Sequence, residues 1–201
     1  MLHINKIITI RNLPVLLFCL LVIKAAASGQ SQKQKEQSQG DGAGYAGADK
    51  LQAYRQLIRD SLPKPHGYVN DYEHIYTVQE EEVLDSLIRA FEKKTTMQIV
   101  VITFDTTMTT RDSLDAMTLQ IGNAWGVGQK GKNNGVAIGI SRGYRKMSIR
   151  NGYGIEKILS NEETKQIIDR FFIPEFRESR YFEGTLNGLV ELMRILGERN
   201  E

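Results

Sequence analysis

Apolar residues recur every three to four positions in four parts of the chain, and this spacing predicts amphipathic helices. The predicted helices cover residues 78–94, 112–125, 162–172 and 181–196. The first begins at a capping box, because Thr77 is followed three positions later by Glu80. Pro174 separates the last two helices. A further short helix over 48–62 is predicted upstream, before Pro63 stops it.

Two short apolar runs, 97–104 and 135–140, have the β-branched composition of strands that are covered on both faces. Because a helix lies between them, they form a right-handed crossover with parallel strands. Residues 146–150 alternate apolar with polar and predict an antiparallel edge strand. The predicted fold is therefore α/β: a compact α/β/α sandwich with a small mixed sheet, in βαββαα order after an N-terminal helix.

Two clusters of Gly and Asn lie before the second strand and after the edge strand, so this topology brings them to the same edge of the sheet. They make that edge our expected ligand site, because glycine lets the backbone approach a ligand closely. The proposed ligand-binding residues are Gly131, Asn133, Asn134, Gly135, Gly152 and Gly154. Tight turns with nothing bound explain the same residues equally well. The opposite edge carries Asp105, Thr106, Ser141 and Arg142 at the strand carboxyl ends, where open α/β sheets usually bind ligands.

Basic residues gather around both edges of the predicted sheet. They are Lys130, Lys132, Arg142, Arg145, Lys146 and Arg150. An anion-binding edge and an ordinary solvated edge both account for them, and we favour the solvated edge because half of them should point away from the glycine cluster.

The N-terminal residues 1–27 have the features of a secretory signal peptide. They contain three basic residues and no acid, an apolar run over 13–23 and an Ala-Ala-Ala sequence that ends at Ala27. We expect cleavage after Ala27; an uncleaved membrane anchor is the alternative. Cleavage also removes Cys19, the only cysteine, and with it any disulfide.

Cleavage changes the charge balance as well. Removing three of the 26 Lys and Arg residues and none of the 24 acids leaves a net charge of about −1, which argues against nucleic acid as a partner. The predicted division is a signal peptide over 1–27, a flexible linker with room for one short helix over 28–65, an α/β domain over 66–197 and a C-terminal tail over 198–201.

Six blocks of sequence occur in the order found in TPM domains, which the chain resembles over residues 66–197. They are Gly67-Tyr68-Val69-Asn70-Asp71-Tyr72, the acidic helix start at 79–82, Gln98-Ile99-Val100-Val101, Trp125-Gly126-Val127-Gly128, Gly131-Lys132-Asn133-Asn134-Gly135-Val136 and Gly152-Tyr153-Gly154. The resemblance implies an α/β domain outside the cytoplasm. Acid phosphatase activity and calcium binding are reported for some members, and plant members of the thylakoid lumen serve photosystem II repair.

The resemblance also assigns candidate site residues. Asp71 is the carboxylate that it supports best, either as a catalytic acid/base or as a metal ligand; a turn or capping role is the alternative. Asn133 and Asn161 stand where many members have aspartate. Asp71, Asn133 and Asn161 are thus the candidate ligands of Ca²⁺, in a site weakened by the loss of two charges.

Two functions follow from these observations. The first is an extracytoplasmic accessory protein that aids the assembly, quality control or repair of an envelope or membrane protein, with weak calcium binding. The second is a metal-dependent acid phosphatase, a phosphomonoesterase. We expect a periplasmic or extracellular location after cleavage, proximity to the membrane through the leader or tether, and no nucleic-acid partner.

Overall fold

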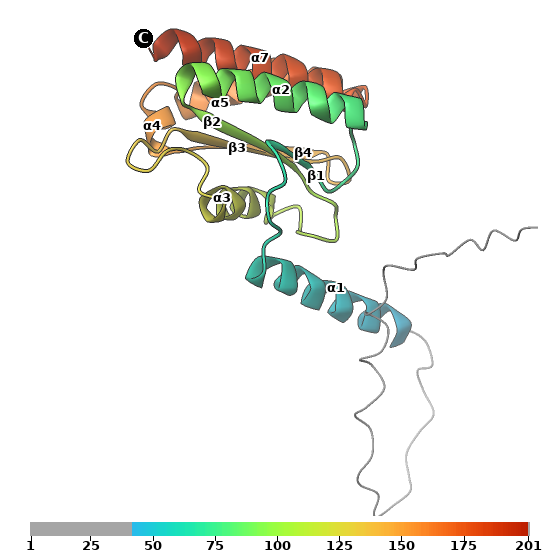
Figure 1. Cartoon of the computed structure of the whole chain (residues 1–201). Helices are drawn as coiled ribbons and strands as arrows, with labels where there is room; N and C mark the ends of the chain where they lie inside the picture. Colours follow the sequence, from blue (N-terminus) through green and yellow to red (C-terminus); the bar gives the residue numbers. More distant parts are fainter. Residues whose placement is uncertain (1–41, 201) are drawn as a thin grey trace, which may run out of the picture. The chain divides into compact units, whose positions relative to one another are not determined.

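The computed structural model describes the backbone of residues 42–200 and the side chains of residues 47–200. The predicted signal peptide over 1–27 and the first part of the predicted linker lie outside the described residues. The described part confirms the α/β fold class, with helices on both faces of a small mixed sheet (Figure 1).

The sheet has four strands in the order β1-β2-β3-β4. They are β1 (Val69–Asp71), β2 (Gln98–Thr103), β3 (Gly135–Ser141) and β4 (Lys146–Asn151). The first three strands are parallel and β4 is antiparallel to β3, with Ile138 opposite Ile149. The sequence pattern predicted β2, β3 and β4 but not β1, because a strand of three residues is too short to show an alternating pattern.

The helices agree with the predicted segments except around Pro174 and after β4. They are α1 (Gly42–Asp60), α2 (Val78–Thr95), α3 (Leu114–Ala124), α4 (Tyr153–Glu156), α5 (Asn161–Ile167), the π-helix η1 (Ile168–Phe172), α6 (Ile173–Arg177) and α7 (Tyr181–Arg199). Pro174 does not separate helices as predicted. It lies in the first turn of α6, where its missing N–H is not needed, and the chain leaves the helix at Ser179 with a φ of 61°.

Each face of the sheet is covered by different helices. Figure 1 shows α2 and α7 on one face and α3 on the other. Successive residues of β2 therefore enter two cores: Ile99 and Val101 pack with α2 and α7, whereas Val100 and Ile102 pack with α3. This two-sided burial explains the continuous apolar runs in the sequence. The capping box at Thr77 forms as predicted, with Thr77 Oγ1 accepting from the Glu80 amide at 3.3 Å.

Helix α1 is longer than the short helix predicted over 48–62, and it contacts the α3 side of the domain. Ile58 packs against the core beneath α3. A guanidinium nitrogen of Arg55 donates to the carbonyl of Thr106 at 2.7 Å and to the hydroxyl of Tyr144 at 3.1 Å. None of the described helices has the length and hydropathy needed to cross a membrane.

Candidate functional site

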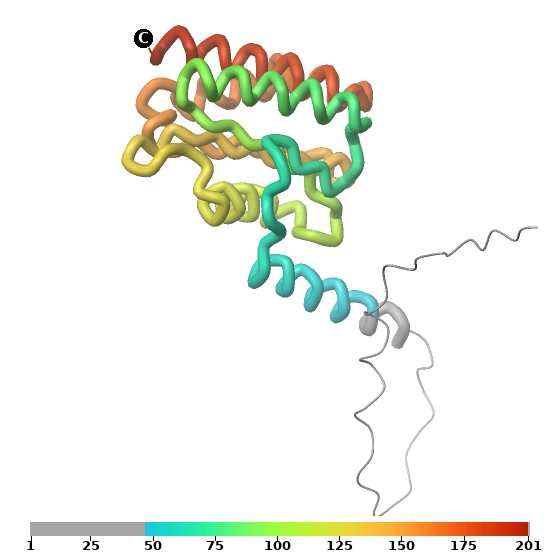
Figure 2. The backbone as a smooth tube through the Cα atoms, in the orientation of Figure 1, coloured from blue at the N-terminus to red at the C-terminus, as the bar shows by residue number. Residues whose placement is uncertain are grey.

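The two Gly and Asn clusters meet at the edge of the sheet where β3 begins. The amide of Gly154 donates to the carbonyl of Asn133 at 2.9 Å, and the amide of Gly152 donates to the carbonyl of Gly135 at 2.9 Å. Figure 2 shows the loop before β3 and the segment after β4 side by side at this end. A Cβ on Gly152 would lie 2.3 Å from the Asn133 carbonyl oxygen, so the chain itself requires glycine there.

The polar groups of this edge form hydrogen bonds with other groups of the protein. The Asn134 side chain is only 8% exposed; it accepts from the Gln129 amide at 2.7 Å and donates to the Thr96 carbonyl at 2.9 Å. The side chain of Gln98 accepts from the Gly128 amide at 2.7 Å. Since these groups already bond to one another, they have little to offer a ligand. We call this end of the sheet, where the two Gly and Asn clusters meet, the glycine edge. Tight turns with nothing bound account for its geometry better than ligand binding does.

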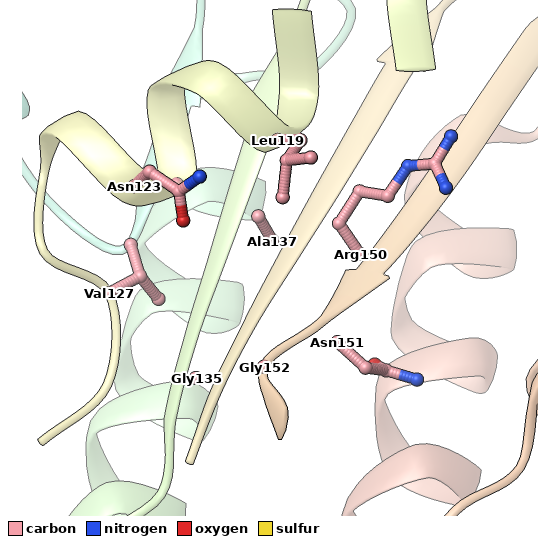
Figure 3. A pocket seen from close by; sticks show the side chains of 9 residues that line it. Leu119, Asn123, Val127, Gly135, Ala137, Arg150, Asn151 and Gly152 are labelled. Atoms are coloured by element: carbon pink, nitrogen blue, oxygen red, sulfur yellow. The ribbon is translucent and has the colours of Figure 1, made fainter. Parts of the chain in front are cut away.

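A small hollow lies beside this edge, between α3 and the sheet (Figure 3). Its volume is about 50 Å³, with Leu119 of α3 facing Ala137 of β3 across it and the Arg150 guanidinium directed away. A space of this size holds one or two water molecules. It is too small for a phosphate ester. The buried Nε of Arg150 and Oδ1 of Asn151 have no hydrogen-bond partner among residues 47–200, and bridging water suits both.

Asp71 lies at the opposite edge, at the carboxyl end of β1, and is 7% exposed. Its carboxylate accepts the hydroxyl of Thr103 and, at 2.9 Å, the amide of Tyr76. It stands opposite Thr103, whereas the glycine edge adjoins Gln98 at the other end of β2. Five steps along a strand correspond to roughly 16 Å. Asp71 therefore cannot share a ligand with the glycine edge.

The three candidate calcium ligands consequently do not form one site. Asp71 and Asn133 occupy opposite edges, and Asn161 is exposed at the first residue of α5. Within residues 47–200, no three His, Cys, Asp or Glu side chains lie close enough to hold a metal. Calcium needs six or more oxygen ligands with enough negative charge, and these residues do not fit it.

The edge where β3 ends holds a groove of about 550 Å³. The β3–β4 turn forms one wall, and the junction of α6 and α7 forms the other. The lining residues are Ser141, Arg142, Arg145, Lys146, Met147, Ile173, Phe176, Arg177, Ser179 and Tyr181. Four of them are cations and none is a carboxylate. We call this feature the basic groove.

The basic groove lies at the edge opposite the Gly and Asn clusters, where sequence analysis had placed the expected ligand site, and it is lined by three of the cations expected to form a solvated edge. Arg142, Arg145 and Lys146 converge with Arg177, which sequence analysis did not single out. The pattern of apolar residues predicts helices but not the turn between α6 and α7, and this turn brings Arg177 to the β3–β4 turn. The rule that open α/β sheets bind ligands at strand carboxyl ends does indicate this edge of the sheet.

Glu73 holds the β3–β4 turn in place from behind. Its carboxylate accepts the amide of Arg142 at 2.6 Å and the amide of Gly143 at 2.7 Å. Burial raises the pKa of Glu73, and the two amides oppose that rise. Burial also raises the pKa of the Tyr181 hydroxyl, and the nearby Glu73 carboxylate adds to it.

The charges in the groove differ in how far they are neutralised. Lys146 pairs with Asp115, with 2.8 Å between Nζ and Oδ2. Arg142, Arg145 and Arg177 are exposed and form no ion pair with any carboxylate among residues 47–200. Three guanidinium groups therefore remain available for hydrogen bonds to an anion.

These features define the class: a three-layered α/β domain with a mixed four-stranded sheet and a basic groove at the carboxyl end of an interior strand. The chain belongs to the TPM domain family, since the model of that family matches residues 69–195.

Solved structures agree with this assignment. The chain is similar to the N-terminal domain of a protein from P. gingivalis, with 26% identity and a TM-score of 0.60 over 71% of this chain and 88% of that one. It shares its fold with the BA42 protein from the psychrophilic bacterium Bizionia argentinensis, with 19% identity and a TM-score of 0.56 over 64% of this chain and 86% of that one. A search of curated proteins found no match.

Proposed function

We propose that this chain is an exported TPM-domain accessory protein that binds another envelope protein through the basic groove and aids its assembly, quality control or repair. The leader-like residues 1–27 support export. The basic groove supports a binding role at the carboxyl edge of the sheet.

The observation that carries this proposal is the combination of size and free charge in the groove. Pockets that hold small molecules typically measure about 300–1,000 Å³, so a groove of about 550 Å³ has room for side chains of a partner. The lining provides cations for recognition but holds no carboxylate pair or histidine of the kind that general acid/base chemistry uses. The groove is therefore better suited to holding a ligand than to transforming it.

Photocrosslinking in the native envelope tests this function. A photoreactive amino acid at Glu178, which is exposed next to Arg177, should yield one dominant protein adduct. The same amino acid at Lys130 in the glycine loop is the matched control and should yield much less of it. Arg142→Gln should reduce the adduct formed at Glu178. Adducts of equal yield from both positions, or none from either, would refute binding through the groove.

A metal-dependent acid phosphatase is the second candidate, and one observation favours it. Guanidinium groups bind phosphate as readily as carboxylate, so the groove suits a phosphomonoester. Against this, the Asp71 carboxylate already accepts hydrogen bonds from Thr103 and Tyr76. The carboxylate that the family resemblance assigns to catalysis therefore has a structural role.

Hydrolysis of p-nitrophenyl phosphate at acid pH, with and without Ca²⁺, separates the two functions. We expect no turnover above that of the denatured protein. Turnover that Arg142→Gln abolishes while the fold stays intact would establish the phosphatase instead.

A further inference from the structure

We infer that the basic groove binds an acidic peptide segment that carries apolar side chains; this rests on the proposed function, and it names the part of the partner that the groove recognises. The chemistry of the lining supports it in three respects: free positive charge, apolar lining residues and the absence of protruding apolar side chains.

The free positive charge determines the sign of the ligand. Arg142 and Arg145 come from the β3–β4 turn and Arg177 comes from α6, so they approach the groove from both walls. Three cations on two walls can contact several carboxylates spaced along a chain.

The apolar part of the lining indicates that the ligand is more than an anion. Met147, Ile173, Phe176 and Tyr181 line the groove and are all half-buried. Covering them releases water and stabilises the complex, which a hydrated phosphate ion cannot do. A peptide with acidic and apolar residues meets both demands.

The position of the apolar residues favours a peptide over a membrane surface. Peripheral membrane binding needs apolar side chains that protrude beside the basic ones and insert among the lipids. The exposed large apolar residues within residues 47–200 are Tyr54, Leu57, Val78, Val83, Leu119, Tyr153 and Val190. None of them lines the groove, whose own apolar side chains are half-buried.

The backbone of Arg145 permits a substitution that leaves the turn intact. Its φ is 47°, in the left-handed region, where asparagine and glycine are favoured over arginine. Arg145→Asn therefore suits the turn at least as well while it removes the charge. This substitution separates binding from folding.

The test measures fluorescence anisotropy of a labelled, C-terminally amidated peptide, Glu-Phe-Asp-Glu-Leu-Asp, with the purified full chain. Its matched control is Gln-Phe-Asn-Gln-Leu-Asn. We expect binding of the acidic peptide only. Arg142→Gln and Arg145→Asn should each weaken it about tenfold, because each removes a charge-assisted hydrogen bond. Lys130→Gln, which removes a charge from the opposite edge, should change the affinity by less than about twofold.

The melting temperature of Arg145→Asn should equal or exceed that of the unchanged chain, so that its loss of binding is not a loss of fold. Equal binding of both peptides would overturn the inference. So would binding to phosphatidylglycerol vesicles, or to inorganic phosphate, without binding to the acidic peptide. If the peptide fails to bind while the Glu178 adduct persists, the acidic segment is wrong and the proposed function stands.

Discussion

Asp71, the last residue of β1, accepts a hydrogen bond from the hydroxyl of Thr103, the residue directly opposite it on β2. Thr103 Oγ1 in turn accepts from the Glu73 amide at 2.9 Å, and Asp71 also accepts from the Tyr76 amide. The carboxylate thus fixes the connection between β1 and α2. It has a structural role that the resemblance to TPM domains did not indicate.

Asp71→Ala should lower the free energy of unfolding by about 3 kcal/mol, because it leaves the buried Thr103 hydroxyl and Tyr76 amide without an acceptor. Urea denaturation measures this loss. Asp169→Ala, which removes an exposed carboxylate paired with Lys165, should cost less than about 1 kcal/mol. A near-neutral effect of Asp71→Ala would contradict the structural role.

Gly135→Ala should destabilise the protein by more than about 3 kcal/mol. A Cβ at this position would lie 2.1 Å from the Val127 carbonyl oxygen, and backbone cannot yield as a flexible side chain can. Gly197→Ala in α7 is the control, since nothing lies within 4 Å of its Cβ; it should stabilise by up to about 1 kcal/mol. Thermal unfolding of both variants measures the contrast, and equal melting temperatures would rule out the close packing of the glycine edge.

Arg55→Ala should loosen α1, because Arg55 links this helix to Thr106 and Tyr144. We expect amide hydrogen exchange in α1 to accelerate by about tenfold, which corresponds to about 1.4 kcal/mol of local stability. Gln56→Ala removes only side-chain bonds within α1 and should leave most of the protection. If both variants exchange alike, Arg55 does not hold the helix to the domain.

Glu163 makes stability depend on acid pH. The Arg199 guanidinium and the Ser160 amide and hydroxyl lower the pKa of Glu163 from 4.5 to about 2. Because the folded pKa is depressed, its contribution is present above about 4.5 and is lost as the pH falls through about 2. Glu163→Gln should therefore melt earlier at neutral pH, with the difference vanishing near pH 2. Glu162→Gln, which changes an exposed neighbour, serves as the control, and a difference that persists at pH 2 would contradict the assignment.

Calcium should not stabilise this chain. A ligand that binds only the native state raises the melting temperature. Asp71 lies at the opposite edge from Asn133, so the candidate ligands do not form one site and added CaCl₂ should act no differently from MgCl₂ at equal concentration. A saturating, calcium-specific rise that Asp71→Asn abolishes would show that a calcium site exists despite this geometry.

Most of the fold was predictable because its signals are local. The capping box at Thr77 and the spacing of apolar residues behind it define α2 without reference to the rest of the chain. The apolar run of β2 indicates burial on both faces, and two cores cover it. Strand β1 was missed because three residues are too few to show an alternating pattern. The helical path through Pro174 was missed because proline usually ends a helix but is tolerated in the first turn of α6.

The candidate site was less predictable, because clusters of Gly and Asn indicate tight turns as readily as ligands. At the glycine edge, Asn134 and Gln98 satisfy the loop's own amides. At the other edge, Arg177 joins Arg142 only because the chain turns between α6 and α7. No local pattern in the sequence predicts that these two arginines lie close together.

The amino-acid sequence by itself determined the elements of this TPM domain, their order and the parallel pairing of its interior strands, because hydrophobic periodicity and helix capping act over a few residues. The tertiary structure alone decided where Asp71 directs its hydrogen bonds and which cations share the basic groove. Those relationships depend on contacts between residues dozens of positions apart, and only the packed chain brings them together.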